Sequence, residues 1–126
     1  MDDTALTFLK RHIEEELRLN EEKYVDSKSF LFQGIAYHRK GQFEEAVISY
    51  KRALKYAPEN ADLWYWLAKT SLVVGEVSAA KSALAKAATA LVNGDFNKRN
   101  YVEEFFQTYQ EDIDDLSKAI QSYEAS

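Results

Sequence analysis

The chain has 126 residues, a formal net charge of −5 and no cysteine. This length suits one domain with a single modest core, and the lack of cysteine excludes disulfides and thiolate metal sites. The longest apolar run, 63–68, is far shorter than the roughly 20 residues that cross a bilayer. We therefore expect a cytoplasmic protein without a membrane partner.

The charge is unevenly distributed along the chain. Residues 1–26 carry a net charge of −4, residues 27–92 carry +4, and residues 93–126 carry −5. A nucleic-acid-binding surface needs a strong basic excess on one face. Here the basic residues alternate with acidic ones, and the acidic ends would repel phosphates, so nucleic acid is not an expected partner.

The first part of the chain predicts two helices, over about 2–24 and 27–40. The buried stripe expected on the first helix consists of Leu6, Leu9, Ile13 and Leu17. Ser27 or Ser29 would cap the second helix, since a serine side chain can accept the free N–H groups of the first turn. Gly41 would end it, because glycine readily adopts the left-handed conformation of a C-cap.

Four further helices are expected, over about 42–57, 61–74, 77–92 and 96–123. Pro58 ends the helix over 42–57, because proline cannot continue a helix. Gly75 closes the helix over 61–74, and Asn93-Gly94 stops the helix over 77–92. No stretch shows the two-residue alternation of a strand. The predicted fold class is all-α.

A pattern of small and large residues occurs twice, 34 residues apart. The first copy consists of Phe30-x2-Gln33-Gly34-x2-Tyr37, then Ala46-x3-Tyr50-x2-Ala53 and Pro58. The second copy consists of Trp64-x2-Leu67-Ala68, then Ala80-x3-Leu84-x2-Ala87. The small residues let paired helices approach closely, and the large ones fill the spaces between them. In this the chain resembles the tetratricopeptide repeat (TPR) family, which implies a short helical solenoid that binds other proteins.

The resemblance implies one TPR domain over 1–126. Its expected parts are an N-terminal capping helix (1–26), repeat 1 (27–60), repeat 2 (61–94) and a C-terminal amphipathic capping helix (95–126). The second repeat departs from the first at Ser71 and Val92, and from Asp95 onward the 34-residue spacing is lost. Because a solenoid needs about three units to be stable alone, the terminal helices are expected to close its ends.

The last predicted helix carries a heptad seam of apolar residues. The seam consists of Val102, Phe106, Tyr109, Ile113, Leu116, Ile120 and Tyr123. Two interpretations remain open at this point. The seam packs inside the chain on the fifth helix as a cap, or it forms a coiled-coil homodimer.

In tetratricopeptide proteins a partner helix or peptide lies in the concave groove lined by the first helix of each pair. On that resemblance the candidate partner-binding residues are Lys28, Leu31, Ile35, His38, Arg39, Tyr65, Trp66, Lys69 and Leu72. An apolar groove with a basic margin suits an amphipathic helix with an acidic flank. The alternative is that the chain's own terminal helices cover the groove. The Lys, Asn and Arg clamp that grips chaperone tails in part of the family is absent.

The sequence offers no catalytic set. The two histidines, His12 and His38, lie on different predicted helices without a paired ligand, so no metal is expected. A glycine-rich phosphate loop is missing, and the acidic runs are typical of solvated helix faces. We expect an adaptor or dedicated chaperone that binds another protein, with no enzymatic activity and no cofactor.

Overall fold

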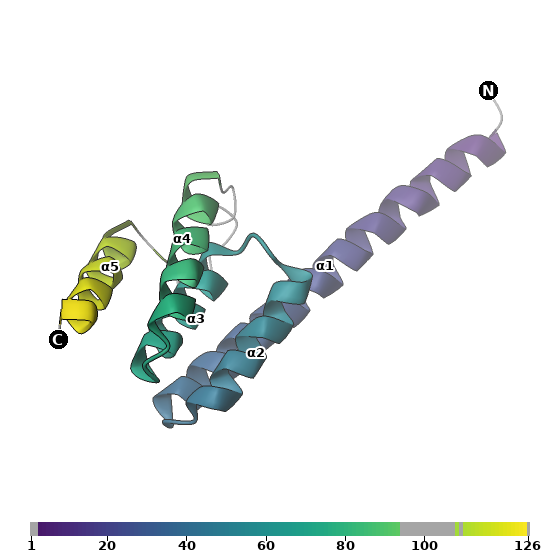
Figure 1. The fold of residues 1–126 in the computed structure, drawn as a ribbon. Helices are drawn as coiled ribbons and strands as arrows, with labels where there is room; N and C mark the ends of the chain where they lie inside the picture. Colours follow the sequence, from purple (N-terminus) through teal and green to yellow (C-terminus); the bar gives the residue numbers. More distant parts are fainter. Residues whose placement is uncertain (1–2, 94–107, 109, 126) are drawn as a thin grey trace.

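A computed structural model of the protein describes residues 3–93, 108 and 110–125. These residues form five α-helices and no strand (Figure 1). In chain order the helices are α1 (Asp3–Arg39), α2 (Phe43–Tyr56), α3 (Ala61–Val73), α4 (Val77–Asn93) and α5 (Gln110–Ala125). The prediction of an all-α fold is confirmed.

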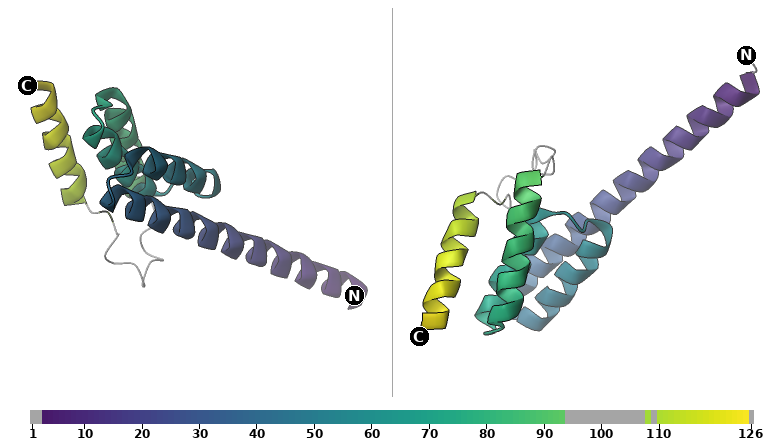
Figure 2. Two further views of the ribbon diagram at one scale, coloured as in Figure 1. Left: turned by 90° about the horizontal axis from the view of Figure 1, so that it is seen from below. Right: turned by 45° about the horizontal axis from the view of Figure 1, so that its top comes forward.

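The helix α1 is continuous over 37 residues, so the predicted break between residues 24 and 27 was wrong. No glycine or proline precedes Gly34, and serine in a helix interior costs only about 0.5 kcal/mol relative to alanine. Ser27 is buried inside the helix and does not cap one. The first half of α1 extends beyond α2, away from the other helices (Figures 1 and 2). The predicted stripe of Leu6, Leu9, Ile13 and Leu17 lies outside the described side chains, and a capping role for residues 1–26 stays a prediction.

The helix boundaries follow local backbone chemistry. Gly41 and Gly75 have φ angles of 80° and 82°, the left-handed conformation expected at these two turns. The carboxamide oxygen of Asn60 accepts hydrogen bonds from the backbone N–H groups of Asp62 and Leu63, at 2.8 and 3.2 Å, and so caps α3. The helix α4 is described as far as Asn93, and the predicted stop at Asn93-Gly94 falls at the edge of the described residues.

The helices pack as two consecutive pairs, α1 with α2 and α3 with α4, and α3 also packs on α2 (Figure 2). Tyr50 of α2 is fully buried against Gly34 of α1, where a Cβ atom would lie 2.6 Å from the Tyr50 Cδ1 atom. One hydrophobic core joins the helices. It includes Leu31, Ile35, Ala46, Tyr50, Ala53, Leu63, Leu67, Ala68, Ala80, Leu84 and Ala87.

The last helix α5 packs chiefly on α4. Its seam residues Ile113, Leu116 and Ile120 are buried in the core of this one chain, whereas Tyr123 is 51% exposed. This burial supports the interpretation of the seam as an intramolecular cap. The other seam residues, Val102, Phe106 and Tyr109, lie outside the described residues.

Within the described ranges 3–93 and 110–125, none of the helices has both the length and the apolar character required to cross a membrane.

Candidate functional site

The residues expected to bind a partner lie on α1 and α3, and the structure divides them by exposure. Lys28, Leu31 and Ile35 are buried. His38, Tyr65, Trp66, Lys69 and Leu72 are half-buried, and Arg39 is exposed. Only the second set lies at the surface.

Three of the candidate residues on α1 are not exposed in this structure. Leu31 and Ile35 are 1% and 2% exposed and belong to the same core cluster as Tyr50 of α2 and Leu63 of α3. In a solenoid of only two pairs, these apolar side chains gain more from joining the core than from facing water. They hold the helices together, and in this structure they present no surface to a partner.

A polar contact joins the C-terminal part of the chain to the buried end of this face. One carboxylate oxygen of Asp62, at the start of α3, accepts a 2.7 Å hydrogen bond from the backbone N–H of Thr108. Asp62 and Thr108 are 1% and 2% exposed. The backbone of residue 108 therefore meets the start of α3 at Asp62. Whether the terminal helices cover the groove stays a prediction.

Burial perturbs the two charged groups at this contact. Burial raises the pKa of Asp62 above its ordinary value, although the hydrogen bonds from Thr108 and the charge of Lys28 oppose that change. Burial also lowers the pKa of Lys28 to about 8, and the Asp62 carboxylate opposes this shift in turn. Each charge thus partly compensates for the desolvation of the other.

Four of the half-buried residues form one group at the surface, which we call the aromatic–basic cluster: His38, Tyr65, Trp66 and Lys69. The Trp66 ring lies at its centre, with ring centroids 5.6 Å from His38 and 6.1 Å from Tyr65 in edge-to-face contacts. The Lys69 ammonium lies 4.8 Å from the Trp66 ring centroid, within the range of a cation–π contact. The cluster therefore combines apolar area with positive charge.

His38 of α1 is held in place by groups from two other helices, α2 and α3. Its Nδ1 atom is 2.8 Å from the Thr70 hydroxyl oxygen of α3, and the Phe43 ring of α2 lies 5.3 Å away, centroid to centroid. Burial lowers the pKa of His38, and the charges of Lys69 and Arg39 lower it further. His38 thus lies in a positive local field, which favours an acidic ligand.

Acidic residues of α5 act on the Tyr65 side of the cluster. Burial raises the pKa of Tyr65, and the nearby carboxylates of Asp112 and Asp115 raise it further. Positive charge therefore lies at the His38 and Lys69 side of the cluster, and negative charge lies near Tyr65.

Trp64 makes contacts different from those of Trp66. Its indole N–H donates a 2.8 Å hydrogen bond to the backbone oxygen of Pro58, and the Lys86 ammonium of α4 lies 4.5 Å from its ring centroid. Pro58 and Lys86 both belong to the folded helix pairs and their connections. These contacts therefore indicate that Trp64 stabilises the second helix pair.

Sequence reasoning missed three contributors to this face: Phe43, Thr70 and Thr108. Thr70 lies on the first helix of the second pair, and the repeat geometry could have placed it beside His38. Phe43 begins α2 directly after the Gly41 turn, which brings it back toward α1. No signal in the sequence indicates the contact of Thr108 with Asp62, because it falls after the 34-residue spacing is lost. Within the described residues, no group of three His, Asp or Glu side chains could hold a metal ion.

These features define a helical-repeat protein with a mixed aromatic and basic surface. Residues 34–72 match the sequence model of a family described as the TPR repeat. The match runs from the close helix approach at Gly34 to the last turn of α3 at Leu72. The resemblance to the tetratricopeptide family is thereby confirmed for this stretch, and TPR repeats are protein-interaction modules. No curated protein matches the chain.

Proposed function

We propose that the protein is an adaptor or dedicated chaperone that binds another protein through the aromatic–basic cluster. The observation that carries this proposal is the half-exposed Trp66 ring, which contacts two further rings and a lysine on the open part of the repeat surface. Aromatic side chains of this kind dominate the energetics of protein interfaces.

The chemistry of the cluster favours an amphipathic helix with an acidic flank. The Trp66 and Tyr65 rings offer apolar area, and Leu72 adds to it one turn beyond Lys69. Lys69 and Arg39 supply positive charge next to this area. A helix whose apolar face docks on the rings can direct its carboxylates to these two basic groups.

The site contains no catalytic chemistry in the arrangement described above. Among the described residues, His38 contacts the Thr70 hydroxyl and aromatic rings, and the charges that act on it are those of Lys69 and Arg39, with no carboxylate to orient its imidazole as a general base. We therefore propose a binding role without enzymatic activity, in the cytoplasm.

The experiment is affinity capture from a lysate of the source cells, read by mass spectrometry. Wild type is compared with Lys69→Glu, which reverses the charge beside Trp66. Lys51→Glu, at an exposed lysine of α2 away from the cluster, is the matched control. We expect a protein that wild type and Lys51→Glu retain and that Lys69→Glu loses, with an affinity lowered by about tenfold or more.

Equal capture by a folded Lys69→Glu variant would contradict the assignment of the cluster. Self-assembly through the last helix is the alternative from the sequence. It gains no support from the structure, because Ile113, Leu116 and Ile120 are already buried against the chain's own core.

A further inference from the structure

The aromatic–basic cluster has positive charge at one of its two ends. The Lys69 ammonium lies 4.8 Å from the centroid of the Trp66 ring, and the His38 ring of α1 lies 5.6 Å from the same ring, centroid to centroid. Lys69 and Arg39 both act on His38 as positive charges. An acidic group of a partner would therefore be attracted to this end of the cluster.

The opposite end of the cluster is Tyr65, whose ring centroid lies 6.1 Å from that of Trp66. The start of α5 lies close to this end. The backbone N–H of Thr108 donates a 2.7 Å hydrogen bond to the carboxylate of Asp62. Asp62 precedes Tyr65 by three residues, so the two side chains are neighbours on one side of α3. The helix α5 then begins two residues after Thr108, at Gln110.

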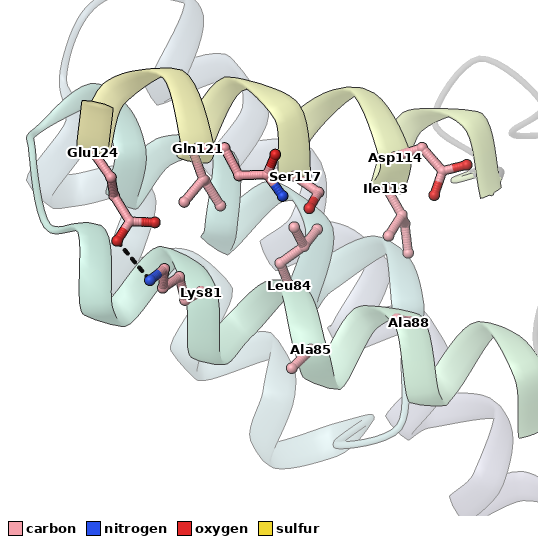
Figure 3. A pocket seen from close by; sticks show the side chains of 10 residues that line it. Lys81, Leu84, Ala85, Ala88, Ile113, Asp114, Ser117, Gln121 and Glu124 are labelled. Carbon is pink, nitrogen blue, oxygen red and sulfur yellow. Dashed lines mark hydrogen bonds and ion pairs between the residues drawn. The ribbon is translucent and has the colours of Figure 1, made fainter. Parts of the chain in front are cut away.

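This placement brings two carboxylates of α5 toward Tyr65. Asp112 is half-buried, and Asp115, about one helical turn further on, is exposed. The helix α5 packs on α3 as well as on α4, and both carboxylates act on the Tyr65 hydroxyl as negative charges. Asp114, between them in the sequence, instead lines the cavity between α4 and α5 (Figure 3). The Tyr65 end of the cluster is therefore negative.

The two ends are separated along the axis of α3. Tyr65 and Lys69 are four residues apart, which corresponds to about 6 Å, and Asp62 lies about 5 Å further in the other direction. A helix bound along α3 would meet both ends within about two of its own turns. A segment of uniform charge would be attracted to one end and repelled from the other.

We propose that the cluster and the start of α5 together select a partner helix whose charge is divided between its two ends. The docked segment of this helix has acidic residues at one end, which meet Lys69 and Arg39, and basic residues at the other, which meet Asp112 and Asp115. This inference rests on the proposed function and adds the specificity of the same site. It makes Asp115 a specificity-determining residue, because a second acidic end on the partner would be repelled there.

Two synthetic helical peptides of about 18 residues serve as probes. They share one leucine stripe and contain equal numbers of glutamate and lysine. In the divided peptide the glutamates fill one half and the lysines the other, whereas in the mixed peptide the two residue types alternate. Because composition and net charge are the same, non-specific attraction is matched. Calorimetric titration into the full-length protein should show that the divided peptide binds about fivefold or more tightly than the mixed one.

Two neighbouring aspartates of α5 supply a matched pair of variants. Asp115→Lys reverses the charge on the Tyr65 side, and Asp114→Lys makes the same change beside the cavity. Both residues are exposed, so the fold should tolerate either substitution. We expect Asp115→Lys to weaken the divided peptide by about fivefold and to remove the preference over the mixed peptide, and Asp114→Lys to keep that preference.

The variant Lys69→Glu separates this inference from the proposed function. Loss of the captured protein by Lys69→Glu, together with an unchanged peptide preference in Asp115→Lys, would support the binding site and overturn the role of α5. Equal binding of the two peptides by wild type, or binding of neither, would also overturn the selection of a divided charge.

Discussion

At the scale of single residues, Lys28 and Asp62 are unusual because both are charged side chains buried in the fold. Charged side chains are rarely buried in this way, because removing them from water costs several kcal/mol that their attraction only partly offsets. Lys28 is 5% exposed and Asp62 is 1% exposed, and each favours the charged form of the other. Asp62 accepts the hydrogen bond from Thr108 and attracts Lys28, so it links α3 to the C-terminal part of the chain and to α1.

The lowered pKa of Lys28 predicts a pH dependence of stability. Between its folded pKa of about 8 and its unfolded value of 10.5, Lys28 is neutral in the folded chain and protonated in the unfolded chain. The unfolded state then binds more protons, so this group makes the free energy of unfolding rise with pH across that window. The gain is at most about 2 to 3 kcal/mol by pH 10.5.

Urea unfolding at pH 8 and pH 10 measures this effect. We expect Lys28→Met to lose the rise that wild type shows and Lys51→Met, at an exposed lysine, to keep it. An equal rise in all three proteins would mean that Lys28 keeps an ordinary pKa and is not desolvated in the fold.

At the scale of elements, the approach of α1 to α2 depends on one missing side chain. A Cβ atom at Gly34 would overlap the ring of Tyr50, which is fully buried and cannot move aside without disturbing the core. Burial also raises the pKa of the Tyr50 hydroxyl to about 12.

We expect Gly34→Ala to lower the free energy of unfolding by about 2 kcal/mol through overpacking. Alanine at an unhindered helix position would instead raise stability by about 1 kcal/mol relative to glycine. The sign of the change in urea unfolding therefore distinguishes a close helix approach from simple helix propensity. A stabilised Gly34→Ala protein would contradict the packing of this pair.

The contact of α5 with α4 can be tested by cross-linking, since the chain has no cysteine of its own. The side chains of Lys81 and Glu124 meet in an ion pair, so cysteines at both positions should react with one short bis-maleimide within a single chain. Val92, eleven residues further along α4 and roughly 16 Å away along its axis, replaces Lys81 in the control pair.

Mass spectrometry of the cross-linked protein reads the result. We expect an intrachain product for Lys81→Cys with Glu124→Cys and little for Val92→Cys with Glu124→Cys. Cross-linked dimers as the main product would show that α5 packs on another copy, and the intramolecular cap would be wrong.

The sequence predicts most of these elements because their signals are local. The left-handed turns at Gly41 and Gly75 follow from single residues and lie where they were expected. The break near Ser27 was predicted from capping preference alone, and a preference of a fraction of a kcal/mol does not end a helix that lacks glycine or proline.

The candidate site was predicted less completely because exposure is a property of the packed chain. The resemblance to tetratricopeptide proteins placed Leu31, Ile35 and Trp66 in the predicted groove. It could not tell that the first two join the core, since this depends on how the helices pack around them. The contact of Thr108 with Asp62 lies beyond the 34-residue pattern, so no signal in the sequence indicates it.

At the scale of the whole molecule, the described helices form two packed pairs followed by α5, and the first half of α1 extends away from them (Figure 1). The aromatic–basic cluster lies on α3 and on the last turn of α1. A partner surface carried by two packed helices suits the adaptor role that we propose.

The most direct test of the central claim follows Trp66 while a partner binds. The chain has two tryptophans, so protein labelled with 5-fluorotryptophan gives two ¹⁹F NMR signals, which the variants Trp64→Phe and Trp66→Phe assign. The partner added is the protein that wild type captures and Lys69→Glu loses. We predict that it shifts or broadens the Trp66 signal and leaves the Trp64 signal, inside the second helix pair, unchanged. A Trp66 signal that stays unchanged at saturating partner would contradict the proposed binding site.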